Sequence, residues 1–111
     1  PIKSSAASDV YKRQEKVTWR AVIKEGMVKE YIKRHDEIWP EMVETLKAAG
    51  ICNYTIWLDG NSLFGYYECE KGAKYALDYQ AESEVVKRWN VSMDPIMTMF
   101  DCKPQKVFEL K

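Results

Sequence analysis

The chain has 111 residues, which is enough for one domain and too few for two. Its 17 basic and 17 acidic residues give a formal net charge of zero, which argues against binding to nucleic acid or to a membrane surface. Apolar residues make up 46% of the sequence, close to the globular norm, and no apolar run approaches the ~18 residues of a membrane span. We expect a folded cytoplasmic protein.

Cysteine and histidine are too few and too scattered to indicate a disulfide scaffold or a metal site. Cys52, Cys69 and Cys102 are odd in number and widely spaced, and His35 is the only histidine. We therefore expect no metal and no cofactor, a reducing compartment, and thiols that are buried as small hydrophobic groups.

The first segment, residues 1–14, has neither helical nor strand periodicity. It is small, polar and basic, and it looks like a translated adapter sequence. The prediction is an unstructured leader that is not native, followed by one folding unit over residues 15–111.

The first half of this unit predicts a strand and a long helical segment. Residues 17–23 alternate apolar and polar side chains, as a strand with one buried face does. Residues 27–49 then place apolar side chains three or four positions apart, and Gly50 follows as a helix stop signal. Because Pro40 cannot donate a backbone hydrogen bond inside a helix, we expect a kink or break between His35 and Pro40.

Two strands follow, over residues 51–58 and 63–70, joined by a turn at residues 59–62 that contains Gly60. Simple alternation along the first of these strands puts four side chains on one face: Cys52, Tyr54, Ile56 and Leu58.

The last third predicts two helices and a strand. Residues 72–80 form the first helix, and Ser83 caps the second, which Pro95 disturbs. Residues 106–110 alternate and predict a last strand at a sheet edge or a dimer interface.

The element order β-α-β-β-α-β predicts an α+β protein with a ferredoxin-like fold, an antiparallel sheet with helices on one face. Trp19 and Trp57 would make the other face too apolar for solvent. We expect a second subunit to cover that face.

One helical stripe combines side chains that could bind a polar ring. Tyr31 and His35 are four residues apart and share a helix face, with Trp39 one turn further on. Aromatic faces can stack on a sugar, and histidine can exchange protons near neutral pH. The same spacing is also typical of an ordinary core, so the pattern alone leaves both interpretations open.

The stretch Glu30–Glu41 (EYIKRHDEIWPE), together with residues 53–59 (NYTIWLD) and the pair Arg88-Trp89, closely resembles the L-rhamnose mutarotase family, and the resemblance runs from Trp19 to Leu110. It implies a homodimer of ferredoxin-like subunits in a dimeric α/β-barrel-type assembly, without a cofactor. It also implies an enzyme, an isomerase that interconverts the α and β anomers of a monosaccharide, L-rhamnose.

The resemblance also implies roles for individual residues. His35 falls on the family's proton donor, and Tyr31 and Tyr54 fall on tyrosines that contact the substrate. Trp89 falls on the first of two adjacent tryptophans that contact the sugar, and the second position is Asn90 here. Replacing an indole by an amide leaves open which 6-deoxy hexose is preferred.

Two other functions on the same scaffold stay open at this point. One is a cofactor-independent monooxygenase acting on polycyclic phenols, and the other is a non-catalytic module that binds a small molecule. Oxygen uptake would identify the first, and sugar binding without faster anomer exchange would identify the second.

Overall fold

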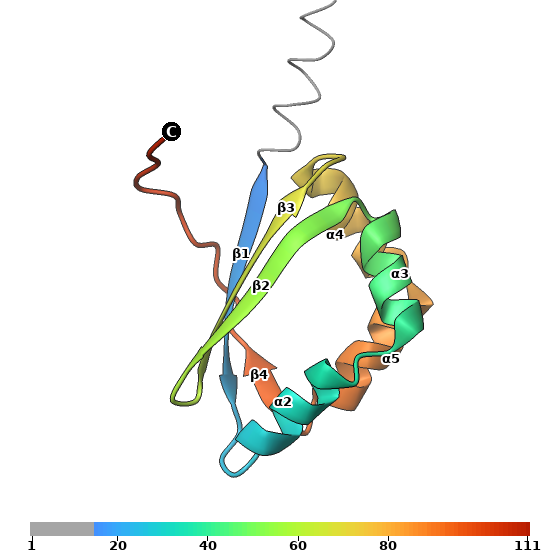
Figure 1. Cartoon of the computed structure of the whole chain (residues 1–111), viewed down its shortest axis with the longest axis vertical. Helices are drawn as coiled ribbons and strands as arrows, with labels where there is room; N and C mark the ends of the chain where they lie inside the picture. Colours follow the sequence, from blue (N-terminus) through green and yellow to red (C-terminus); the bar gives the residue numbers. More distant parts are fainter. Residues whose placement is uncertain (1–14) are drawn as a thin grey trace, which may run out of the picture.

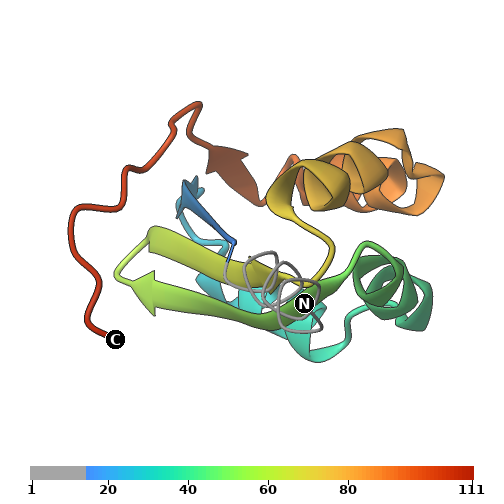
Figure 2. The same cartoon turned by 90° about the horizontal axis from the view of Figure 1, so that it is seen from above.

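The computed structural model describes residues 15–111, which form one sheet with all the helices on one side of it (Figures 1 and 2). The predicted leader, residues 1–14, lies outside the described residues. The strands are β1 (Lys16–Ile23), β2 (Ile51–Asp59), β3 (Ser62–Cys69) and β4 (Met97–Met99). The helices are α2 (Val28–Asp36), α3 (Pro40–Ala48), α4 (Ala73–Glu82) and α5 (Glu84–Met93).

The sheet has the strand order β2-β3-β1-β4, and every neighbouring pair is antiparallel. Each helical segment therefore connects two strands that are separated by a third, which is the split βαβ connectivity of the predicted ferredoxin-like fold. The prediction of an α+β fold is confirmed.

Proline divides the long helical segment as predicted. Helix α2 ends at Asp36, and α3 begins with Pro40 in its first turn, where a missing N–H costs nothing. The extended backbone of Trp39, with ψ 132°, makes the corner. The two short helices can therefore follow the curve of the helix layer in Figure 1.

The second helical segment also has a break that the sequence predicts. Ser83 lies between α4 and α5, and its Oγ accepts a hydrogen bond from the backbone N–H of Val86 at 3.3 Å. Helix α5 then presents Val86, Trp89 and Met93 to the core.

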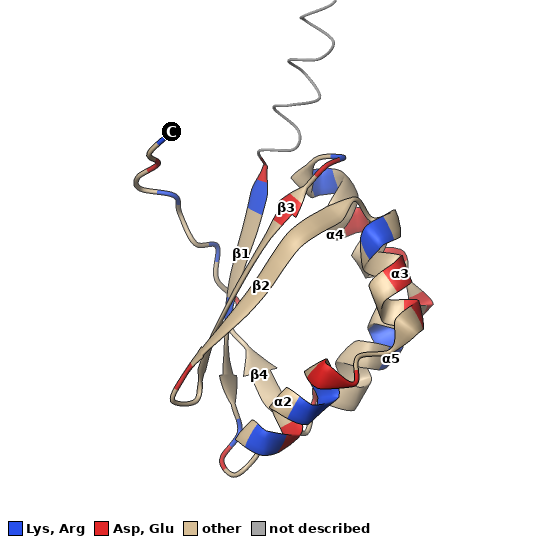
Figure 3. Cartoon of the chain, viewed as in Figure 1, with Lys and Arg blue, Asp and Glu red and all other residues tan. Residues whose placement is uncertain are grey.

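The main core lies between the helices and the centre of the sheet. Buried side chains from β1, α2, α3, β3, α5 and the turn between α5 and β4 meet there: Ala21, Ile23, Tyr31, Met42, Leu63, Val86, Trp89, Met93 and Ile96. Charged residues are frequent on the helices and at the strand ends, and most of the sheet is uncharged (Figure 3).

A β-bulge in β2 changes which side chains share a face of the sheet, so the faces predicted for this strand are partly wrong. Asn53 has a positive φ of 49°, and the β2–β3 register shifts between Cys52 and Thr55. Tyr54 and Ile56 face the helices as predicted. Cys52 does not, because it pairs with Glu68 on the opposite face of the sheet.

Trp19 also lies on the other side of the sheet from the one expected. On the helix side it packs against the main core and against a second buried cluster, so it contributes nothing to the outer face. The second cluster consists of Ala49, Ile51, Tyr67, Cys69 and Ala76. Trp57 does lie on the outer face, where 66% of its surface is exposed.

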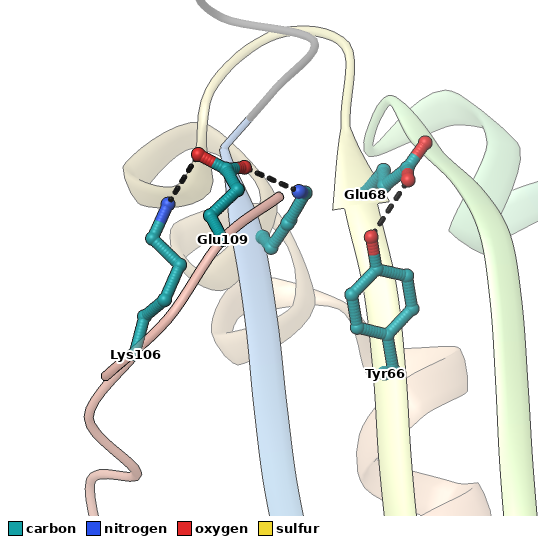
Figure 4. Close-up of polar contacts among 5 residues, drawn as sticks. Tyr66, Glu68, Lys106 and Glu109 are labelled. Carbon is teal, nitrogen blue, oxygen red and sulfur yellow. Dashed lines mark hydrogen bonds and ion pairs between the residues drawn. The ribbon is translucent and has the colours of Figure 1, made fainter. Parts of the chain in front are cut away.

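The predicted last strand over residues 106–110 is wrong. The fourth strand is β4, which pairs with Ala21–Ile23 of β1, and residues 100–111 have no regular secondary structure. The apolar side chains Val107, Phe108 and Leu110 are exposed, so the alternation has no face to bury. The segment is tied to β1 by an ion pair between Lys16 Nζ and Glu109 Oε2 at 3.1 Å (Figure 4).

The prediction that all the thiols are buried holds for one of them. Cys69 is buried, and desolvation raises the pKa of its thiol to about 11, which makes it inert. Cys52 is half-buried and Cys102 is exposed. None of the helices in the described part of the chain is long and apolar enough to cross a membrane.

Candidate active site

A cavity of about 1220 Å³ lies between the sheet and the helix layer. The five predicted site residues all line it: Tyr31, His35, Tyr54, Trp89 and Asn90. They come from α2, β2 and α5, so the fold brings together three segments that are distant in sequence and that only the resemblance had grouped. A concave site with apolar walls and a few polar groups is typical of small-molecule binding.

Tyr31 holds the imidazole of His35 in two ways. The two rings stack with centroids 4.2 Å apart, and His35 Nδ1 lies 3.0 Å from the backbone oxygen of Tyr31. Since a carbonyl oxygen only accepts, Nδ1 is the donor. In the neutral ring the proton therefore sits on Nδ1, and Nε2 is the nitrogen that takes up and releases a proton.

Burial governs the acidity of His35. Desolvation lowers its pKa below the usual 6.5, and this outweighs the opposite effects of the Tyr31 carbonyl and the Asp36 carboxylate. At neutral pH the ring is mainly neutral, with Nε2 ready to accept a proton. Its protonated form is a stronger acid than an exposed histidine.

Trp89 lies beside His35 in the cavity wall, and Trp39 packs against Trp89. Trp89 meets the imidazole edge-on, with centroids 5.4 Å apart, and Trp39 meets Trp89 in the same way at 5.2 Å. Trp39 itself is not among the cavity-lining residues, so the Tyr-His-Trp stripe divides into two lining residues and one that supports Trp89. Arg88 lies over Trp39 and pairs with Glu41 at 3.3 Å, which links α5 to α3.

Tyr54 faces the cavity from the sheet. Its hydroxyl oxygen accepts a hydrogen bond from Trp19 Nε1 at 2.9 Å, and its ring packs against Tyr67 at 4.9 Å. Burial raises the pKa of Tyr54 well above 10, which the Trp19 hydrogen bond opposes only in part. Tyr54 is therefore a neutral phenol under all ordinary conditions.

The Tyr31 hydroxyl is buried and has no hydrogen-bond partner among residues 15–111. Burial raises the pKa of this phenol to about 12. A buried polar atom without a partner costs free energy, and such atoms are rare. Because Tyr31 lines the cavity, a ligand hydroxyl is the natural partner for this group.

Further polar or aromatic side chains line the cavity, and those on β1, β3 and α4 that were not singled out as site residues from the sequence are Trp19, Tyr67 and Gln80. Gln80 Nε2 donates to the Tyr67 hydroxyl at 3.2 Å. Their positions depend on strand register and on the placement of α4, so no local pattern could reveal them. Asn90 was identified only by resemblance, and it is the exposed member at the cavity wall.

Within the described ranges, no three His, Cys, Asp or Glu side chains gather where they could hold a metal ion. The polar groups that line the cavity include hydrogen-bonding side chains that suit hydroxyls, such as Tyr31, Tyr54 and Asn90, and the charged side chains of Lys24, Asp36 and Asp94.

Comparison with known proteins identifies the relatives of this chain. The family model described as L-rhamnose mutarotase matches residues 16–110. An L-rhamnose mutarotase of Listeria monocytogenes is 51% identical over 74 residues, which cover 65% of this chain and 69% of the relative. Another, from Acidiphilium cryptum, is 39% identical over 104 residues, which cover 86% of this chain and 98% of the relative.

A solved structure agrees. The crystal structure of an L-rhamnose mutarotase from Formosa agariphila superimposes with a TM-score of 0.75 at 27% identity, and it covers 88% of this chain and all of that one (100%). Similarity that extends over nearly the whole described chain, in both sequence and fold, shows that the chain belongs to the L-rhamnose mutarotase family.

Proposed function

We propose that the protein is a sugar mutarotase that interconverts the α and β anomers of L-rhamnose or a related 6-deoxy hexose. The observation that carries the proposal is the position of His35 in the cavity, stacked on Tyr31 and flanked by Trp89. Its Nδ1 is engaged with the Tyr31 carbonyl, which leaves Nε2 for proton exchange. Family membership supports the same activity.

The reaction needs only proton transfers. In ring opening, protonated His35 gives its Nε2 proton to the ring oxygen, the bond from the anomeric carbon to that oxygen breaks, and the anomeric hydroxyl loses its proton to form the aldehyde. Rotation about the bond between the first two carbons exposes the other face. Closure reverses the transfers, and His35 regains the proton. A positioned acid or base typically contributes ~10²–10⁴-fold to such a step.

The phenols of the site are hydrogen-bonding groups and do not act as bases. Burial raises the pKa of Tyr31 to about 12 and that of Tyr54 further, so neither is ionised at neutral pH. Of the two candidates for taking the anomeric proton, Tyr54 and a water molecule, these shifts favour water. Tyr31 and Tyr54 would then hold sugar hydroxyls in place.

Asn90 is proposed to set which 6-deoxy sugar fits. It follows Trp89 on α5 and lines the cavity. An amide donates and accepts hydrogen bonds where an indole would offer a flat apolar face. We therefore expect the preference between epimers that differ in one hydroxyl to depend on this position.

Saturation-transfer NMR tests the function directly. Exchange between the α and β anomeric protons is measured for L-rhamnose and for L-fucose, with and without the protein. The proposal predicts faster exchange for at least one sugar. A folded protein that accelerates neither would contradict it. Sugar binding without acceleration would indicate a binding module, and oxygen uptake with a polycyclic phenol would indicate a monooxygenase.

A homodimer is the second part of the proposal. On the outer face of the sheet, Trp57, Phe64, Arg20 and Phe100 lie in one row across three strands and the segment after β4. Arg20 lies over the rings of Phe64 and Phe100, at 6.0 and 5.3 Å. Trp57 is 66% exposed and both phenylalanines are 42% exposed.

No helix covers this face among the described residues, and residues 100–111 run along the same side (Figures 1 and 2). Contiguous exposed aromatic groups commonly mark an interface, and two copies related by a two-fold axis could bury them against each other.

The proposed location is the cytoplasm, which the family's action on a free monosaccharide supports and which cell fractionation would test.

A further inference from the structure

Trp19 lines the cavity, although the proposed reaction assigns it no role. It stands on β1 directly opposite Gly65 of β3, and its indole N–H reaches past β3 to the Tyr54 hydroxyl on β2, at 2.9 Å. The contact spans three strands on the helix side of the sheet.

The Trp19 indole can cross β3 to reach Tyr54 because Gly65 has no side chain. A Cβ placed on Gly65 would lie 2.0 Å from Trp19 Cε2 and 2.1 Å from Nε1. Such distances are far inside van der Waals contact, so the indole lies directly on the glycine backbone. The bulge at Asn53 is also needed for this hydrogen bond, because it turns Tyr54 toward the helix side of the sheet, where Trp19 lies.

The chemistry of the hydrogen bond determines its direction. An indole N–H can only donate, so the Tyr54 oxygen must accept. Within residues 15–111, Trp19 is the only hydrogen-bonding partner of that oxygen, and no acceptor takes the phenol's own proton. The Tyr54 hydroxyl therefore has its proton available to donate to an acceptor in the cavity.

Tyr67 is held in a similar way beside it. Gln80 donates to the Tyr67 oxygen at 3.2 Å, so this oxygen is also occupied by a protein donor, and the Tyr67 ring supports the Tyr54 ring at 4.9 Å. The rotation of the Tyr54 phenol is thus restrained from both the β1 side and the β3 side.

From this geometry we infer that Trp19, seated on Gly65, is a positioning residue that fixes the Tyr54 hydroxyl as a hydrogen-bond donor to an oxygen of the bound sugar. The inference rests on the proposed function for the identity of the ligand. It goes further in assigning a role to a residue on another strand that acts only through Tyr54.

A double-mutant cycle of Trp19→Phe and Tyr54→Phe separates positioning from packing. Phenylalanine keeps an aromatic ring over Gly65 and removes the N–H. We expect Trp19→Phe to lower kcat/KM for anomer exchange about fivefold in the Tyr54 protein, as loss of one oriented hydrogen bond does. In the Tyr54→Phe background the same change should have less than a twofold effect. Equal losses in both backgrounds, or no loss in the first, would overturn the inference.

Trp57→Phe is the matched control. It also removes an indole N–H that donates within the chain, to Thr55 Oγ1 at 3.1 Å, but it does so on the outer face of the sheet. Its kcat/KM should stay within twofold of the unmodified protein, which would show that loss of an indole hydrogen bond is not harmful in itself.

A spectroscopic measurement keeps the inference testable if no sugar turns over. In ¹H–¹⁵N NMR spectra, the Trp19 Nε1–H resonance should move on Tyr54→Phe substitution and again when L-rhamnose is added to the unmodified protein. A resonance that ignores the Tyr54→Phe change would overturn the inference. A protein with the Trp19 response but without faster anomer exchange would contradict the proposed function alone.

Discussion

The backbone oxygen of Tyr31 accepts a hydrogen bond from Nδ1 of His35 at 3.0 Å, while the Tyr31 ring stacks on the imidazole at 4.2 Å. One residue thus sets both the tautomer and the orientation of the histidine proposed to act as the acid. The helical spacing of four residues supplies this arrangement locally, because side chains at i and i+4 share a face.

Stability should depend on pH through His35. In the unfolded chain this histidine takes up a proton near pH 6.5, whereas in the folded chain burial lowers its pKa. The stability contributed by the neutral ring is therefore fully present above pH 6.5 and is lost as the pH falls from there through the folded pKa. The urea concentration at the unfolding midpoint should fall between pH 7.5 and pH 5, and this fall should be larger in the unmodified protein than in the His35→Asn variant. Equal falls would show that His35 makes no such contribution.

Tyr31→Phe should separate stability from sugar binding. The change removes a buried hydroxyl that has no partner in the described chain, so the free energy of unfolding should stay the same or rise by about 1 kcal/mol. If that hydroxyl contacts the sugar, KM should rise about tenfold. Tyr75→Phe, on an exposed tyrosine of α4, is the matched control and should change neither quantity. A large loss of stability in Tyr31→Phe would mean that the hydroxyl has a structural partner.

Gly65→Ala should destabilise the fold by about 1–3 kcal/mol, as overpacking in a filled core does, because the added methyl would lie 2.0 Å from the Trp19 ring. The control is the same change in a Trp19→Val background, where the smaller side chain leaves room. There the cost should drop below 1 kcal/mol. Chemical unfolding of the unmodified protein, the two single variants and the double variant measures the cost of Gly65→Ala in each background. A cost that is as large in the Trp19→Val background would show that the added methyl clashes with a residue other than Trp19.

Phe64→Glu should break the proposed dimer. A carboxylate at the centre of the aromatic row would have to lose its water together with the neighbouring Arg20 when two copies pack on this face, and burying such an ion pair costs more than burying the aromatic ring that it replaces. Sedimentation velocity should show a monomer for this variant and a dimer for the unmodified chain. Val91→Glu, an equally drastic change at an exposed apolar residue of α5, should remain a dimer. A monomer in the unmodified protein would contradict the dimer itself.

The sequence predicts the features that depend on local chemistry. Pro40 ends one helix and starts the next, Ser83 caps α5, and the turn at Gly60 joins β2 to β3. Each follows from what one residue can or cannot hydrogen-bond. The pairing of Tyr31 with His35 is local in the same sense.

The features that the sequence missed depend on register and on distant partners. Alternation cannot show that the bulge at Asn53 moves Cys52 to the outer face. It also cannot show that Trp19 needs a glycine on the neighbouring strand, or that β1 pairs with Met97–Met99 and not with residues 106–110. The cavity itself arises only when the sheet and both helical segments come together.

The most direct test of the account is the anomer exchange rate of the His35→Asn variant. Asparagine keeps a donor for the Tyr31 carbonyl and lacks the nitrogen that exchanges the proton. Saturation-transfer NMR with the preferred sugar should show exchange slowed ~10²–10⁴-fold relative to the unmodified protein, in a variant that still folds and still binds the sugar. A folded, sugar-binding variant that exchanges anomers at the unmodified rate would contradict the role of His35.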